Sequence, residues 1–148
     1  MDCGFPICCR DNGPNQKKPM PGDKLAGYWG DYACDLPVHT LETMFDFISK
    51  NQDTLKTDFI TWTGDSSGHN IWDNTDEEIT NDTLLITDLL KSKIKDLGID
   101  VFPIQGNHDT WPVNVQDFSA PNSNYGINHY KEAWTDTDWL SAEEATEF

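Results

Sequence analysis

The feature that most constrains the fold is a pair of short apolar runs with the same kind of ending. Phe59-Ile60-Thr61-Trp62-Thr63 is followed by Gly64-Asp65, with His69 four residues later. Val101-Phe102-Pro103-Ile104-Gln105 is followed by Gly106-Asn107-His108-Asp109. Apolar residues on both alternating faces are typical of strands buried in the middle of a sheet. We therefore predict two buried strands, each ending in a glycine and polar side chains, where open α/β sheets bind their ligands.

The segment between these runs predicts one long helix, from about Thr75 to Leu97. Thr75 is a good N-cap, acidic residues follow it in the first turn, and Gly98 ends the helix. A strand, a crossover helix and a second strand form a βαβ unit, whose strands are parallel. Both strand ends then open on the same edge of the sheet, so we expect Asp65 and Asn107 to lie close together.

The remaining segments complete an α/β domain. A helix is expected from near Asp35, with Pro37 in its first turn, and a short helix is expected from Tyr130 to Trp134. We divide the chain into a cysteine-rich loop (1–34), an α-β-α-β core (35–110) and a tail of loops and short helices (111–148). The aromatic cluster in Gly27–Tyr32 is interpreted either as a lid over the edge of the core or as a wall facing a substrate.

Composition excludes several kinds of partner. The formal net charge is −16 and the pI is near 4.2, so the surface repels nucleic-acid backbones and anionic membranes. Apolar residues make up 36% of the chain, enough for a core. No run approaches the roughly 20 apolar residues of a transmembrane helix. The sequence does not indicate an oligomeric state.

The four cysteines predict an oxidising compartment. Cys3, Cys8, Cys9 and Cys34 are even in number and lie in the first quarter of the chain, which favours two disulfides. Adjacent Cys8 and Cys9 do not easily bond to each other, so Cys3–Cys8 with Cys9–Cys34 and Cys3–Cys9 with Cys8–Cys34 both stay open. A zinc site is the alternative, although the spacing matches no common zinc finger. The glycosylation sequon at Asn81 agrees with secretion. No signal peptide is visible at Met1, so we expect one upstream and interpret the chain as a fragment.

The polar clusters after the two strands predict a two-metal site. A carboxylate can bridge two divalent cations, and two-metal sites activate water and hold phosphate oxygens. Asp65 is the natural bridge, and the carbonyl of Asn107 is a plausible ligand. His108 could protonate a leaving oxygen, and His69 could contact the phosphate or share that role. His39, away from the apolar stripe of its helix, is interpreted as a surface residue.

These motifs resemble those of the calcineurin-like metallophosphoesterases. G-D-x-x-x-H (64–69) and G-N-H-D (106–109) are similar to their second and third signatures. The wider context resembles one branch of them, the acid sphingomyelinases. It includes Cys8-Cys9-Arg10, Ala26-Gly27-Tyr28-Trp29-Gly30, Cys34-Asp35-Leu36-Pro37, Trp62-Thr63-Gly64-Asp65 with His69 and Trp72, Pro112-Val113-Asn114, Ala133-Trp134 and Trp139-Leu140.

The resemblance implies part of a four-layer α/β sandwich and a secreted or lysosomal phosphodiesterase. Such an enzyme uses two zinc ions to hydrolyse sphingomyelin to ceramide and phosphocholine, by in-line attack of a metal-bound hydroxide. It implies Asp65 as bridging ligand, Asn107 as ligand of the second metal, and His108 and His69 as the candidates for leaving-group protonation and phosphate contact. It also favours the Cys3–Cys8 and Cys9–Cys34 pairing.

The family's D-x-H motif and its later histidine and G-H-x-H motifs are absent from this sequence, which leaves Asp65 and Asn107 of the usual ligand set. We therefore expect a central fragment of the catalytic domain that is inactive alone and binds zinc weakly. Two alternatives remain: a nucleotide phosphodiesterase of the same branch, and a non-catalytic secreted binding module.

Overall fold

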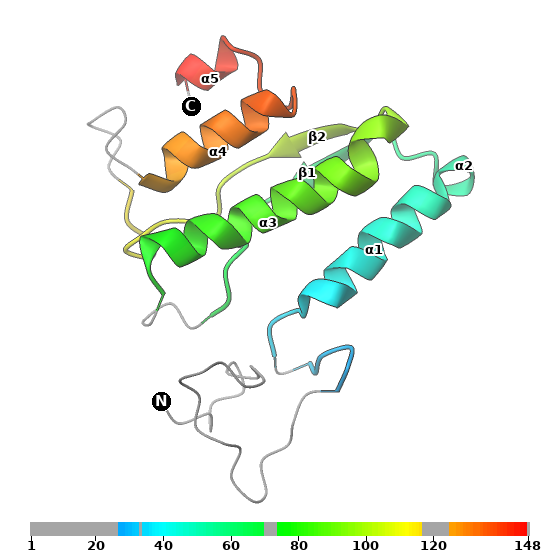
Figure 1. Ribbon diagram of the computed structural model, residues 1–148, viewed down its shortest axis with the longest axis horizontal. Helices are drawn as coiled ribbons and strands as arrows, with labels where there is room; N and C mark the ends of the chain where they lie inside the picture. Colours follow the sequence, from blue (N-terminus) through cyan, green and yellow to red (C-terminus); the bar gives the residue numbers. More distant parts are fainter. Residues whose placement is uncertain (1–26, 33, 70–73, 117–124, 148) are drawn as a thin grey trace, which may run out of the picture. The chain divides into compact units, whose positions relative to one another are not determined.

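The computed structural model describes residues 27–32, 34–69, 74–116 and 125–147 (Figure 1). The chain forms two compact units, residues 1–44 and 45–148. The elements in order are α1 (Val38–Lys50), α2 (Gln52–Leu55), β1 (Phe59–Trp62), α3 (Asp76–Ile94), the 3₁₀ turn η1 (Lys95–Leu97), β2 (Asp100–Pro103), α4 (Tyr125–Asp136) and α5 (Glu144–Glu147). None of the described helices has the length and apolar character needed to cross a bilayer.

The two predicted strands pair in parallel, as the βαβ pattern requires. Phe59 of β1 stands opposite Asp100 of β2, and Trp62 stands opposite Pro103. The backbone N–H of Ile104 donates to the carbonyl of Trp62 at 2.9 Å, which extends the pairing by one residue. Both strands therefore end at the same edge of the sheet, and the predicted convergence of the following loops is confirmed.

The expectation that both faces of the strands are buried is wrong for the described residues. Val101 points to the covered face and is 2% exposed, whereas Phe59 and Phe102 are more than half exposed on the opposite face. Their rings touch edge to face with centroids 6.0 Å apart. Among the described residues, α3 and α4 cover one face only (Figure 1), and no described layer covers the other.

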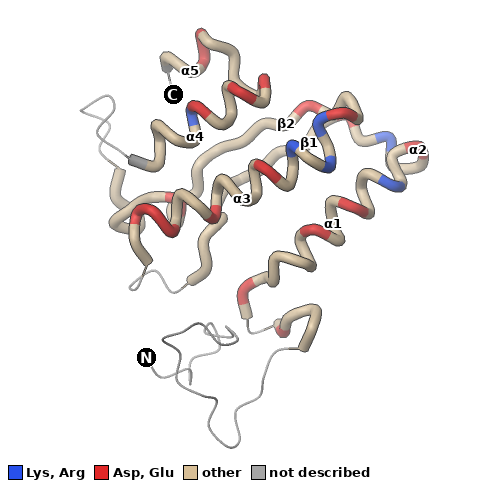
Figure 2. Tube along the Cα trace, in the orientation of Figure 1, with Lys and Arg blue, Asp and Glu red and all other residues tan. Residues whose placement is uncertain are grey.

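Helix α3 begins and ends where its sequence predicts. The hydroxyl of Thr75 accepts a hydrogen bond from the Glu78 N–H at 3.2 Å, and the Glu78 carboxylate accepts one from the Thr75 N–H at 2.9 Å. This capping box satisfies two of the backbone donors that a helix start leaves free. Acidic residues lie in the first turn of α3 and lysines in the last (Figure 2), as the helix dipole favours. After the 3₁₀ turn, Gly98 adopts a left-handed conformation and ends the segment.

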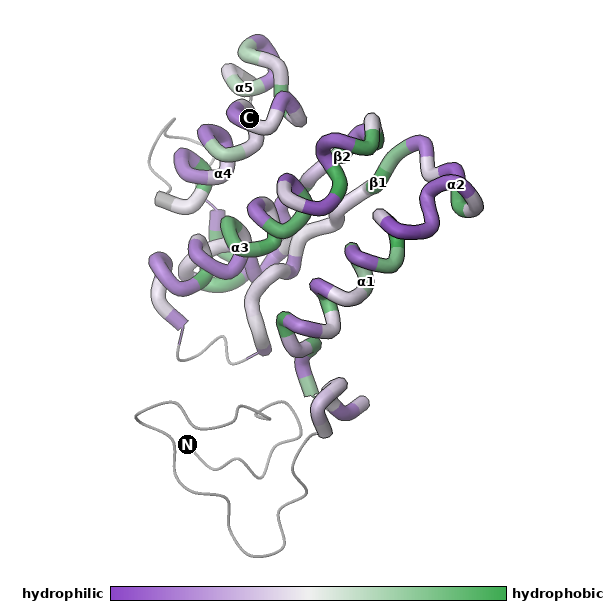
Figure 3. The backbone as a smooth tube through the Cα atoms, turned by 45° about the vertical axis from the view of Figure 1, so that its right-hand side comes forward, coloured by the Kyte–Doolittle hydropathy of each residue, from purple (hydrophilic) through white to green (hydrophobic). Residues whose placement is uncertain are grey.

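The buried face of α3 is rich in threonine. Thr80, Thr83 and Thr87 are at most 2% exposed, whereas Leu85 is 40% exposed. The indole N–H of Trp134 in α4 donates to the Thr87 hydroxyl at 3.1 Å, so a polar partner is needed inside the helix pair. Polar and apolar residues alternate along α3 (Figure 3), which is typical of a helix with one buried side.

Helix α4 is longer than the predicted Tyr130–Trp134 segment, and it packs on α3. Tyr130 and Trp134 are almost fully buried and stack with ring centroids 5.7 Å apart. Trp134 also meets Trp62 of β1 edge to face at 5.7 Å. These contacts join the tail of the chain to the βαβ unit and form the centre of the core.

In the N-terminal unit, Gly27 and Gly30 close a tight turn through two backbone hydrogen bonds. Helix α1 begins at Val38 rather than near Asp35, because Pro37 supplies the carbonyl that accepts from Thr40 and Leu41. Pro37 disfavours helical backbone angles at the residue before it, Leu36, so the helix cannot start near Asp35.

The structure describes one of the four cysteines. Cys34 is disulfide-bonded. Cys3, Cys8 and Cys9 lie outside the described residues. The disulfide-stapled N-terminal loop and the pairing of its cysteines therefore stay predictions.

Candidate functional site

The site lies where the loops after β1 and β2 meet, and two glycines allow the loops to touch. A Cβ on Gly64 would overlap the backbone nitrogen of Gly106, and a Cβ on Gly106 would overlap the Asp65 carboxylate. Gly64 also has φ +74°, a conformation that L side chains rarely adopt. The sequence places glycine at both positions because no larger residue fits.

Asp109 links the two loops through hydrogen bonds. Its carboxylate accepts hydrogen bonds from the backbone N–H groups of Asp65 at 2.7 Å, Ser66 at 2.8 Å and Gly106 at 2.8 Å. The Thr83 hydroxyl of α3 approaches the same carboxylate at 3.4 Å. Asp109 is 3% exposed, and a buried carboxylate is stable when it accepts several hydrogen bonds.

The backbone carbonyl of Asp109 is held as well. It accepts hydrogen bonds from the Tyr130 hydroxyl and the Gln105 side chain, both at 3.2 Å. Burial raises the pKa of the Tyr130 phenol, which keeps this donor protonated. Asp109 therefore connects the two loops with α3 and α4. Sequence reasoning assigned it no role, although it is the last residue of the G-N-H-D motif.

Asp65 is exposed at the edge of the sheet, where the strand pattern predicts a ligand-binding carboxylate. Its backbone is left-handed, with φ 57°. One carboxylate oxygen, Oδ1, accepts a hydrogen bond from the backbone N–H of His108 at 2.9 Å. This bond joins the aspartate of one loop to the histidine of the other, so Asp65 and His108 share one site.

His69 and His108 lie side by side. Their rings meet edge to face with centroids 4.9 Å apart, although one follows β1 and the other β2. The Nδ1 atom of His108 is buried and has no hydrogen-bond partner among the described residues. A buried polar atom without a partner is costly, so a substrate, a bound ion or a further segment would satisfy it.

Asn107 lies in the same loop as His108, with its side chain exposed. Its amide nitrogen donates to the side-chain oxygen of Asn114 at 2.8 Å. All four predicted site residues of the strand ends (Asp65, His69, Asn107 and His108) therefore belong to the two converging loops. Their chemical roles are not tested by these contacts and stay predictions.

The other predicted site residues lie elsewhere in the described parts of the chain. His39, interpreted from the sequence as a surface residue, is half-buried in the N-terminal unit, where it stacks on Tyr28 with ring centroids 4.1 Å apart. Asn81 is exposed on α3, where a glycan would point into solvent, but its modification stays a prediction.

The donor set fits part of a divalent-metal site. Asp65 and Asn107 supply carboxylate and amide oxygens, which such cations bind, and two imidazoles adjoin them. Within the described residues, no group of three or more His, Cys, Asp and Glu side chains is placed to hold a metal ion. A structural zinc site has about four ligands, so the residues present supply only part of one.

Comparisons with known proteins identify the family of this chain. The family model of the calcineurin-like phosphoesterases matches residues 34–146. Sphingomyelin phosphodiesterase B of Dictyostelium discoideum is 38% identical over 146 residues, covering 97% of this chain and 21% of that protein. Sphingomyelin phosphodiesterase of Bos taurus is 37% identical over 151 residues, covering 96% and 22%.

A cyclic GMP-AMP phosphodiesterase of Homo sapiens is 28% identical over 138 residues, covering 91% of this chain and 28% of that protein. The chain thus spans between a fifth and about a quarter of the length of these three relatives.

Proposed function

Because this chain belongs to the calcineurin-like phosphoesterase family, whose members typically bind metal ions, we propose that it forms part of a phosphodiesterase that hydrolyses sphingomyelin to ceramide and phosphocholine. The proposal includes two divalent cations, zinc being the expected metal, and a secreted or lysosomal location. It also includes the four-layer sandwich as the fold of the whole domain.

One observation carries the proposal: the Asp65 carboxylate and the His69 and His108 imidazoles share the junction of two loops. The backbone N–H of His108 bonds to Asp65 Oδ1 at 2.9 Å, and the two rings stand 4.9 Å apart. An acidic ligand beside two proton-carrying groups suits hydrolysis of a phosphodiester. Similarity to several sphingomyelin phosphodiesterases supports the choice of substrate.

The chemistry divides between the metals and the side chains. Bound divalent cations would supply Lewis acidity and an activated water. Asp65 and Asn107 would hold these cations with their oxygens. His108, whose backbone N–H is held by the Asp65 carboxylate, would donate a proton to the leaving ceramide oxygen. His69 would contact the phosphate or share the proton transfer.

A chimera tests this function. The segment of the Dictyostelium sphingomyelin phosphodiesterase B that aligns with this chain, 21% of that protein, is replaced by residues 1–148. We expect the folded chimera to hydrolyse sphingomyelin in zinc. Asp65→Asn, which keeps the shape but removes the charge, should reduce turnover to background. His108→Gln should lower kcat about 100-fold or more, the usual contribution of a general acid. A folded chimera in which both variants keep full activity would refute the assignment.

A second candidate substrate comes from the cyclic GMP-AMP phosphodiesterases, which are 28% identical to this chain. The same chimera, assayed with a cyclic dinucleotide, distinguishes the two. Faster turnover of the dinucleotide than of sphingomyelin would favour the nucleotide phosphodiesterase. A non-catalytic binding module predicts a folded chimera that hydrolyses neither substrate.

A further inference from the structure

Asn114 holds Asn107 at two points. The Nδ2 amide of Asn107 donates to Oδ1 of Asn114 at 2.8 Å. The backbone carbonyl of Asn107 accepts from the backbone N–H of Asn114 at 3.0 Å. One residue thus fixes both the main chain and the side chain of Asn107. Because Nδ2 faces Asn114, the carbonyl oxygen Oδ1 at the other end of the amide faces away from it.

The loop that places Asn114 is closed by its own hydrogen bonds. Asn114 has φ 63°, a left-handed conformation in which asparagine is enriched over most other residues. The N–H of Val115 donates to the carbonyl of Pro112 at 3.0 Å. The Thr110 hydroxyl reaches the carbonyls of both Asn107 and Pro112 at 3.3 Å. The position of Asn114 is therefore set locally.

The orientation of the Asn107 amide decides whether it can bind a cation. The two ends of an amide have nearly the same shape, but one end accepts and the other donates. A divalent cation binds the oxygen, whereas a rotated amide would present N–H groups to it. Among the described residues, Oδ1 of Asn107 accepts no hydrogen bond, so this oxygen is left for another partner.

We propose that Asn114 is a positioning residue, which selects the rotamer of Asn107 in which Oδ1 faces a bound divalent cation. The proposal rests on the proposed function, since Asn107 acts as a ligand only in a metal-binding domain. Asn114 itself does not touch the cation or the substrate. Its effect passes entirely through the amide of Asn107.

Two substitutions separate the side-chain contact from the backbone. Asn114→Gly keeps the left-handed backbone and the N–H that bonds to Asn107, but removes the side-chain acceptor. Asn114→Asp keeps an acceptor for Nδ2. The first readout uses the metal-free 148-residue chain labelled with ¹⁵N, in which the exchange of the Asn107 side-chain amide protons with solvent is measured by NMR. We expect exchange about tenfold faster in Asn114→Gly and unchanged in Asn114→Asp.

The second readout is a titration of the same samples with zinc chloride, followed through the Asn107 and Asp65 resonances. Outer-shell partners contribute about 10- to 100-fold to metal affinity, so Asn114→Gly should bind zinc about tenfold more weakly. Asn114→Asp should bind at least as tightly as the unchanged chain. Asn107→Ala gives the zinc affinity of a chain that lacks the Asn107 side-chain oxygen.

The outcomes separate this inference from the proposed function. If the Asn107 side-chain amide exchanges equally fast in Asn114→Gly and in the unchanged chain, the inference is overturned, regardless of the measured zinc affinity. Faster exchange with unaltered zinc affinity, while Asn107→Ala weakens binding, would also overturn it and leave the metal site standing. If millimolar zinc moves neither the Asp65 nor the Asn107 resonance in the unchanged chain, the amide exchange decides the inference, and the sphingomyelin assay of the chimera decides the proposed function.

Discussion

The carboxylate of Asp109 holds the backbone of Asp65, 44 residues away in the sequence, through a 2.7 Å hydrogen bond from the Asp65 N–H. The same oxygen, Oδ2, accepts from the Gly106 N–H at 2.8 Å. One buried atom therefore fixes the two loops against each other, and the candidate ligands move as a unit. The site geometry therefore depends on a buried residue that is not itself a candidate ligand.

Asp109→Ala should destabilise the protein by about 3 kcal/mol or more, because it leaves three backbone donors without their charged acceptor. Asp109→Asn should be destabilising by about 1–3 kcal/mol, since an amide retains one acceptor but brings its own donors toward the same N–H groups. Urea unfolding followed by circular dichroism measures both. Asp88→Asn, on the exposed side of α3, is the matched control. A loss under about 0.5 kcal/mol for Asp109→Ala would contradict the clamp.

The close approach of the two loops predicts different costs for two glycine substitutions. Gly64 and Gly98 have similar backbone angles, φ +74° and φ +69°, but a Cβ on Gly98 would meet nothing within 4 Å. Gly98→Ala should cost about 1–2 kcal/mol, from the left-handed backbone alone. Gly64→Ala should cost considerably more, because its Cβ would overlap the backbone of Gly106. If thermal or urea unfolding shows the same loss of stability in Gly64→Ala and Gly98→Ala, the close approach of the two loops does not contribute to stability.

The hydrogen bond between Trp134 and Thr87 predicts a third effect. Thr87→Val has nearly the same shape but leaves the buried indole N–H without an acceptor, at a cost of about 1–3 kcal/mol. Thr87→Ser keeps the hydroxyl and loses only a methyl group, so it should be less destabilising than Thr87→Val. The free energies of unfolding of the two variants give the comparison. A more stable valine variant would mean that packing, rather than the 3.1 Å hydrogen bond, determines this position.

The βαβ unit could be predicted from sequence because its signals are local. The apolar runs, the Thr75–Glu78 capping box and Gly98 each determine the structure of their own segment, and the parallel register follows from the connection. The convergence of the loops that carry Asp65 and Asn107 could be predicted for the same reason, whereas the hydrogen bond from the His108 N–H to Asp65 could not.

The features that escaped prediction depend on tertiary partners. Thr83 and Thr87 look like surface residues until Asp109 and Trp134 are placed beside them. Asp109 is the last residue of the G-N-H-D motif, but its role depends on N–H groups of the other loop, those of Asp65 and Ser66. Phe59 and Phe102 have the pattern of buried residues, yet the described residues cover only the opposite face. Helix α2 is four residues long, too short for a periodic pattern.

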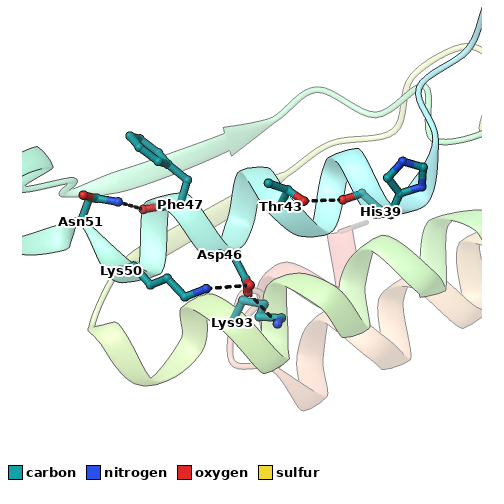
Figure 4. Close-up of polar contacts among 7 residues, drawn as sticks. All are labelled: His39, Thr43, Asp46, Phe47, Lys50, Asn51 and Lys93. Atoms are coloured by element: carbon teal, nitrogen blue, oxygen red, sulfur yellow. Dashed lines mark hydrogen bonds and ion pairs between the residues drawn. The ribbon is translucent and has the colours of Figure 1, made fainter. Parts of the chain in front are cut away.

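The last prediction concerns the acid sensitivity of the contact between α1 and α3. Lys93 and, next to it, Lys50 hold the pKa of Asp46 below its ordinary value of 3.8. The carboxylate lies 2.7 Å from the Lys93 ammonium and 3.0 Å from that of Lys50 (Figure 4). A pKa lower in the folded state means that the contribution to stability is complete above the unfolded pKa. It is lost as the pH falls through the folded value.

The difference in urea midpoint between the unchanged protein and Asp46→Asn should therefore be constant above about pH 5 and shrink below about pH 4. Because the Asp46 side chain is only partly buried and open to solvent, added salt should shrink the same difference at neutral pH. Asp88→Asn, which has no ion pair among the described residues, should show neither trend. A difference that grows on acidification would have the wrong sign for an ion pair and would assign the effect of Asp46→Asn to helix propensity instead.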